Sequence, residues 1–273
     1  MGNNDIRKMS IKNKIYEDYI KKSRLPEYKI LLKEAKKNGY VMMGILDFYN
    51  YILNNKGIER NTRILLNRHD IDTSPNIAKK MFLIEQDVYG TEGSSTAYFR
   101  ESTIDISLIK QIEMNGYETG YHYEQLATYE KKHKCKSSDV LNERIFEIRE
   151  IFSKDYIDYK NRTGTNSFSV ASHGDFVNTK LDMQSYSILE DVNLRKKLGI
   201  VVEAYDKAIM DYVNERFADQ LLLDNFCKKV MDAINRKTHV IMILTHPRNW
   251  EVDIFSNTKE NFVRLFQGIK YKL

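Results

Sequence analysis

Apolar and polar positions follow two periods along the chain, and together they predict strands separated by helices. Short apolar runs of strand character occupy 62–70, 94–100, 117–124, 168–175, 198–205 and 239–247. Apolar residues at helical spacing occupy 75–88, 105–116, 137–152 and 221–237. Ser74 and Pro75 are typical of a helix N-cap and first turn, and Gly116 of a helix end.

This alternation predicts parallel βαβ units and an α/β fold. At this chain length we expect a distorted (β/α) barrel of about seven parallel strands. Residues 1–60 read as an N-terminal helical extension or cap, with a possible short strand at 40–46. Residues 61–273 then form the barrel domain, because no Gly/Ser-rich linker or fixed repeat divides the chain.

Composition narrows the functional class. Apolar residues make up 42% of the 273 residues, which is enough for a core, and the net charge is only +5. The basic residues are interspersed with acidic ones, so a nucleic-acid partner is not expected. Two cysteines without a CxxC spacing do not predict a disulfide framework or a cysteine zinc site. Without an apolar leader or an 18-residue apolar run, we expect no membrane span and a cytoplasmic location.

Polar groups gather where the predicted strands end. Asp70 and Asp72 end one strand, and His122, His173 and His246 each end another. In a parallel barrel these ends form one mouth, where active sites lie. Each group also has an ordinary structural explanation. The aspartates suit a helix N-cap, and a lone histidine on an apolar strand is usually a hydrogen-bonded core residue.

The spacing within "HDID" adds a chemical argument. Side chains alternate along a strand, so Asp70 and Asp72 point the same way. Two adjacent carboxylates repel unless a cation neutralises them. A divalent metal ion bound to one of them would leave the other free to accept a proton from an activated water, which is hydrolytic chemistry.

With these residues in place, the chain resembles the polysaccharide deacetylases, metal-dependent carbohydrate esterases of the glycoside hydrolase/deacetylase barrel superfamily. The resemblance runs from 62 to 250 and rests on the stretches "RHDID", "TAYF", "MNGYETGYHYE" and "ILTHP". It is closest to a subgroup associated with surface-polysaccharide synthesis. The resemblance implies Asp70 as general base, Asp72 and His122 as metal ligands, and His246 as general acid. It implies zinc or another divalent ion as cofactor.

Two departures from the family pattern bear on this site. Leu126 stands where the family has a second metal-binding histidine, and "ASHGD" replaces the motif whose arginine orients the base. We expect His173 to be the third ligand, with Glu124 and then His69 as alternatives. Arg68 or Arg100 is expected to replace the missing arginine.

The sequence therefore favours a hydrolase that removes an N-acyl group from an amino sugar or glycan precursor in surface-polysaccharide or cell-wall metabolism. We expect Arg100, Glu124 and Trp250 to bind the carbohydrate substrate. Two alternatives stay open. One is a catalytically impaired barrel that binds glycan or a partner protein, and the other is a different C–N hydrolase on the same barrel.

Overall fold

The structure is a computed structural model that describes residues 11–135, 137–166, 168–219 and 223–272. In this part of the chain, eight parallel strands form one sheet. They are β1 (Tyr40–Met43), β2 (Arg63–Ile71), β3 (Thr96–Phe99), β4 (Glu118–Tyr123), β5 (Ser169–Ser172), β6 (Val202–Glu203), β7 (Glu215–Ala218) and β8 (Val240–Thr245).

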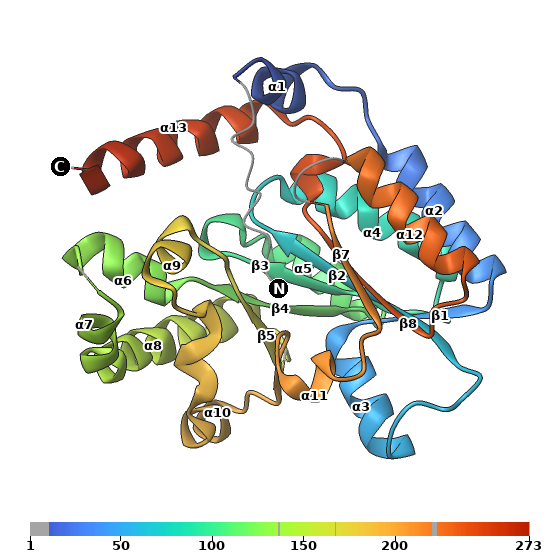
Figure 1. Cartoon of the computed structure of the whole chain (residues 1–273), viewed down its shortest axis with the longest axis horizontal. Coiled ribbons are helices and arrows are strands. Elements are labelled where there is room, and N and C mark those ends of the chain that lie inside the picture. Colours follow the sequence, from blue (N-terminus) through green and yellow to red (C-terminus); the bar gives the residue numbers. More distant parts are fainter. Residues whose placement is uncertain (1–10, 136, 167, 220–222, 273) are drawn as a thin grey trace.

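Helices separate and surround these strands (Figure 1). The longer ones are α2 (Leu25–Lys37), α3 (Ile45–Asn55), α4 (Pro75–Tyr89), α5 (Ile106–Met114), α6 (Gln125–His133), α8 (Ile145–Thr163), α12 (Leu223–Asn235) and α13 (Ile254–Lys272). The shorter ones are α1 (Ile11–Ile15), α7 (Ser138–Glu143), α9 (Phe176–Leu181), α10 (Val192–Leu198) and α11 (Lys207–Met210). Short π or 3₁₀ turns are η1 (Tyr16–Ile20), η2 (Glu101–Thr103), η3 (Ser185–Glu190) and η4 (Pro247–Asn249).

Seven strands follow one path, β6-β5-β4-β3-β2-β8-β7, and β1 pairs with the first half of β2. The path ends at β6 and β7, and no pairing between these two strands closes the ring in the described part of the chain. The sheet is therefore a curled, open (β/α) barrel ringed by helices, which confirms the predicted α/β fold class (Figure 1).

Strand β2 shows how the alternation positions the site. Its Ile64 and Leu66 side chains belong to a core cluster inside the curl, whereas Leu65 and Ile71 belong to the core beneath the surrounding helices. The same period carries Arg68 and Asp70 inward above the apolar pair. The interior is thus apolar at its lower end, where α3 contributes Phe48, and charged at its upper end.

Gly120 on β4 makes room for this interior. A Cβ at Gly120 would lie 2.5 Å from the ring of Tyr98 and 2.8 Å from the carbonyl oxygen of Ser169. No side chain fits at that separation, so glycine lets the Tyr98 ring cross the inside of the sheet. The ring lies 5.3 Å from the guanidinium carbon of Arg68 and forms a floor under the charged layer.

Some local predictions need correction. Ser74 precedes α4 as expected, but it has φ +59° and its side chain makes no capping hydrogen bond. The single helix expected over 137–152 is two helices, α7 and α8, that meet at Arg144. Strand β7 was not predicted. Residues 1–10, and the first two residues of the helix expected at 221–237, lie outside the described residues.

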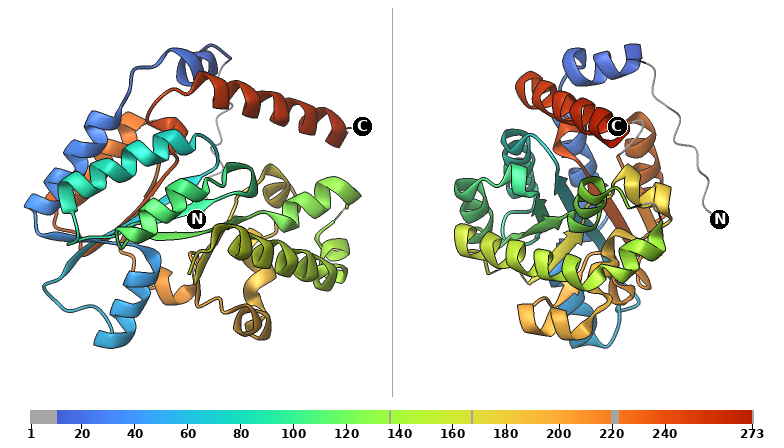
Figure 2. Two further views of the ribbon diagram at one scale, coloured as in Figure 1. Left: turned by 180° about the vertical axis from the view of Figure 1, so that it is seen from behind. Right: turned by 90° about the vertical axis from the view of Figure 1, so that its left-hand side faces the viewer.

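Residues 11–60 contribute to the barrel as well as to its surroundings. Strand β1 joins the sheet, and α2 packs against α4 and α12. The turn η1 packs against the first part of α13, and the C-terminal end of α13 extends away from this contact (Figure 2). Among the described residues, no helix combines the length and apolar character that crossing a membrane requires.

Candidate metal centre and catalytic groups

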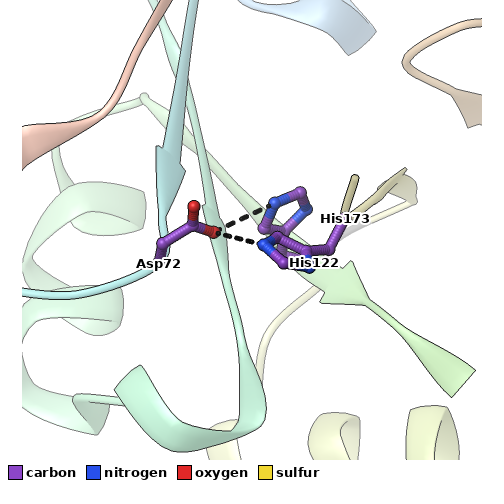
Figure 3. Close-up of side chains that lie close together, drawn as sticks. All are labelled: Asp72, His122 and His173. Carbon is purple, nitrogen blue, oxygen red and sulfur yellow. Dashed lines mark ion pairs between the residues drawn. The ribbon is translucent and has the colours of Figure 1, made fainter. Parts of the chain in front are cut away.

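Three strand ends bring a carboxylate and two imidazoles together. Asp72 follows β2, His122 lies on β4 and His173 follows β5. The Nε2 atoms of His122 and His173 lie 3.4 Å and 3.5 Å from the same Asp72 oxygen, Oδ1 (Figure 3). One possible ligand atom from each of the three residues lies within 4.8 Å of those from the other two. The side chains converge as ligands around a small cation would.

A hydrogen bond to a backbone carbonyl outside this group fixes the orientation of the His122 ring. Its Nδ1 lies 3.0 Å from the carbonyl oxygen of Ala171. A carbonyl only accepts, so Nδ1 carries the hydrogen, and in the neutral ring the Nε2 lone pair faces Asp72. The Oδ1 atom of Asp72, which both imidazoles face, is buried without a hydrogen-bond partner. An oxygen atom in this state suits a divalent cation such as zinc.

The electrostatics of the group also call for positive charge. Burial by itself raises the pKa of Asp72, but the two histidines lower it well below its usual range. Burial by itself lowers the pKa of His173, but Asp72 and Glu124 raise it to about 9. The Asp72 carboxylate is therefore ionised, and His173 is protonated at neutral pH. That proton supplies the balancing positive charge that a bound cation would supply instead.

Asp70 is held by Arg68. Its Oδ1 and Oδ2 accept hydrogen bonds of 2.7 Å and 2.8 Å from Nε and Nη2 of Arg68, which is fully buried. Burial raises the pKa of Asp70, but the charge and hydrogen bonds of Arg68, together with the charges of His122 and His246, lower it below its usual value. The same Oδ2 lies 3.4 Å from Nε2 of His122. Asp70 is thus an ionised carboxylate beside the three-residue group, oriented by an arginine two residues earlier on the same strand.

His246 follows β8 and has a partner that sequence reasoning missed. Its Nδ1 lies 2.6 Å from Oδ1 of Asp219, and Asp219 Oδ2 accepts from Nε1 of Trp250 at 2.9 Å. Burial lowers the pKa of His246, but Asp219 raises it to about 9, with further contributions from Asp70 and Asp72. His246 is therefore protonated at neutral pH, and its Nε2 is left to donate to another group.

Arg100 and Glu124 form a second charged layer over His173. Arg100 Nη2 donates to both oxygens of Glu124 at 2.9 Å and 2.8 Å. Glu124 Oε2 lies 3.4 Å from His173 Nδ1, and Arg100 Nη1 lies 3.8 Å from Oε1 of Glu260 on α13. Burial raises the pKa of Glu124, but His173 and Arg100 lower it to about 2. Of the two arginines expected to orient the base, Arg68 contacts Asp70 and Arg100 contacts Glu124.

The remaining residues singled out in the sequence lie elsewhere. His69 faces away from Asp70, with its ring nitrogens 2.6 Å from Thr245 Oγ1 and 2.6 Å from Glu85 Oε1. Leu126 is buried in the core at the start of α6. Trp250 is fully buried, so its indole orients Asp219 and offers no face to solvent.

Of the comparisons with known proteins, the one with solved structures finds a similarity. No family model matches the sequence, and no curated protein matches it. Among solved structures, the chain is similar to the Streptococcus pyogenes deacetylase PplD in complex with acetate. The two share 13% sequence identity, the match covers 64% of this chain and 70% of that one, and the TM-score is 0.40. The site is therefore interpreted from its own geometry.

Proposed function

We propose that this chain is a metal-dependent amide hydrolase that removes an N-acyl group, acetyl foremost, from an amino sugar or glycan precursor in surface-polysaccharide or cell-wall metabolism. One observation supports this above all. Three side chains that could hold an ion, those of Asp72, His122 and His173, lie beside a carboxylate fixed by an arginine and an imidazole fixed by a carboxylate. Amide hydrolysis needs a base for water and an acid for the leaving nitrogen, and these two groups supply them.

The proposed ligands of the ion are Asp72, His122 and His173. One oxygen and two nitrogens match the three protein ligands usual at catalytic zinc sites, and the His122 bond to Ala171 is the outer-shell contact such ligands usually make. A divalent ion held there would lower the pKa of a water molecule and polarise the amide carbonyl. His173 then takes the place of the histidine absent at Leu126.

Asp70 and His246 divide the proton transfers. Asp70 is ionised, and each of its oxygens retains a second lone pair beyond the one that Arg68 occupies, so it accepts the proton of the attacking water. His246 carries a proton at neutral pH and donates from Nε2 to the departing amine, because Nδ1 is bound to Asp219. Arg68 orients Asp70 and favours its ionised form. Asp219 orients His246 and favours its protonated form.

The test measures turnover and metal content together. The protein is loaded with zinc and assayed for acetate release from a panel of N-acetylated sugars, beside Asp70→Asn. We expect wild type to release acetate and Asp70→Asn to retain its zinc but lose turnover, because the amide is nearly isosteric and cannot accept the proton. Near-full activity in Asp70→Asn would remove Asp70 as the base. Zinc binding without acetate release from any sugar would favour a different C–N substrate.

A further inference from the structure

A second cavity opens at the seam where the barrel does not close. Its volume is about 680 Å³, within the usual range of small-molecule sites. It is lined by Tyr205 and Asp206, which follow β6, by Arg216 of the outer strand β7, and by residues of η3, α10 and α11. Because β6 and β7 end the sheet path, this cavity is a product of the open barrel.

One aromatic ring joins this cavity to the proposed catalytic site. Tyr205 lines the cavity, and its ring centroid lies 4.6 Å from the guanidinium carbon of Arg68, the residue that holds Asp70. The ring also lies 4.9 Å from the guanidinium carbon of Arg216, another lining residue. Two side chains, Tyr205 and then Arg68, therefore lie between the cavity and the carboxylate of Asp70.

Hydrogen bonding ties the opposite wall to the same site. Ser185 lines the cavity, and its Oγ donates to Oγ of Ser172 at 2.9 Å. Ser172 is the last residue of β5 and immediately precedes His173. The ring of Tyr186 lies 6.1 Å from that of Tyr205 at an interplanar angle of 28°. The cavity thus has an aromatic wall of the kind that packs against the apolar face of a sugar ring.

Three basic side chains (Arg195, Lys207 and Arg216) and two acidic ones (Glu190 and Asp206) line the cavity, and they differ in how they are paired. Arg195 is neutralised by Asp206, with bonds of 2.6 Å and 2.7 Å. Arg216 has no carboxylate within ion-pair distance among the described residues, and it is exposed. Lys207, also exposed, has only Asp211 at 3.8 Å. An unpaired guanidinium beside tyrosine rings suits a planar anionic group such as a carboxylate or a phosphate.

We propose that this cavity binds an anionic sugar residue of the substrate, with its ring beside Tyr186 and its carboxylate or phosphate on Arg216. This inference rests on the proposed function, because it assigns the acidic sugar to the glycan whose neighbouring N-acyl group is hydrolysed. The substrate class is then an acidic glycan, and neutral N-acetyl sugars are poorer ligands.

The experiment measures binding with turnover switched off. Zinc-loaded Asp70→Asn protein is titrated calorimetrically with three probes: neutral N,N′-diacetylchitobiose, a glucuronic acid–N-acetylglucosamine disaccharide and N-acetylglucosamine 1-phosphate. The second and third probes distinguish a carboxylated from a phosphorylated sugar. Each titration is repeated with two double variants, Asp70→Asn with Arg216→Gln and Asp70→Asn with Arg60→Gln. Arg60 is the matched control, an exposed arginine outside the cavity.

We expect at least one anionic probe to bind about tenfold more tightly than the neutral one, as charge-assisted hydrogen bonds exceed neutral ones. Arg216→Gln removes this preference and Arg60→Gln retains it. Equal affinities for all three probes, or a preference that survives Arg216→Gln, would overturn the proposal. Acetate release from chitobiose by the wild-type protein is scored separately. Release without an anionic preference defeats the cavity proposal alone, and an Arg216-dependent preference without any hydrolysis defeats the hydrolase proposal alone.

Discussion

Replacing Arg68 with methionine tests how the charged layer is held together. Arg68 and Asp70 are 0% and 3% exposed and share two hydrogen bonds of 2.7 Å and 2.8 Å. Removing one partner of a buried ion pair leaves an uncompensated charge and costs about 3–5 kcal/mol. We therefore expect Arg68→Met to lower the free energy of unfolding by about that amount. The pKa of Asp70 should rise, because burial would then act without the arginine.

The double variant Arg68→Met with Asp70→Asn tests whether the loss of stability in Arg68→Met comes from the unpaired charge of Asp70. It contains no buried charge at this pair, so it should be more stable than Arg68→Met alone. Arg63→Met is the matched control on the same strand. Arg63 is half-buried and its Nη1 donates one hydrogen bond, to the Asn38 carbonyl at 2.9 Å, so the expected loss is about 1 kcal/mol.

All four proteins would be unfolded in urea in the presence of a chelator, with the midpoint and slope fitted for each. A loss below about 1 kcal/mol in Arg68→Met would refute the reasoning, since that is the range of a neutral hydrogen bond. A double variant less stable than Arg68→Met would refute it as well.

Two further predictions concern the general acid and the pH dependence of stability. Asp219→Asn should lower kcat by roughly 10²- to 10⁴-fold with little change in KM, because His246 loses its charged partner, and steady-state kinetics would show whether KM changes instead. Burial raises the pKa of Glu118 from 4.5 to about 7, so the folded protein keeps a proton that the unfolded chain releases. Stability should therefore fall as the pH rises from about 4.5 to 7, by at most about 3 kcal/mol from this group. Glu118→Gln should flatten that fall in urea titrations, with the remaining slope due to Glu203, whose pKa burial also raises to about 7. An unchanged slope would contradict the burial argument.

The sequence pattern predicted the parts of the site that depend on strand periodicity. Residues two apart on β2 point the same way, which placed Asp70 with Asp72 and sent His69 to the opposite side. The same rule also places Arg68 beside Asp70. Only the two hydrogen bonds, however, distinguish Arg68 from Arg100 as the partner of that carboxylate.

Asp219 was missed because its strand lacks an apolar run. The four residues of β7 are alternately half-buried and exposed, as suits the outer strand of an open sheet, and among the described strands β8 alone pairs with it. An edge strand with one solvated face carries little periodic signal over four residues. The hydrogen bond from Trp250 to Asp219 is a tertiary contact between side chains 31 positions apart. It therefore had no local signature.

The central claim is that Asp72, His122 and His173 hold a divalent ion, and zinc affinity tests it most directly. Zinc would be titrated by competition with a chromophoric chelator into wild type, His173→Ala and Glu124→Ala. We predict one tight site in wild type. Glu124→Ala should weaken it by no more than the roughly 10- to 100-fold typical of outer-shell partners, and His173→Ala should weaken it further. Equal, tight binding in all three proteins, or no binding in wild type, would contradict the account.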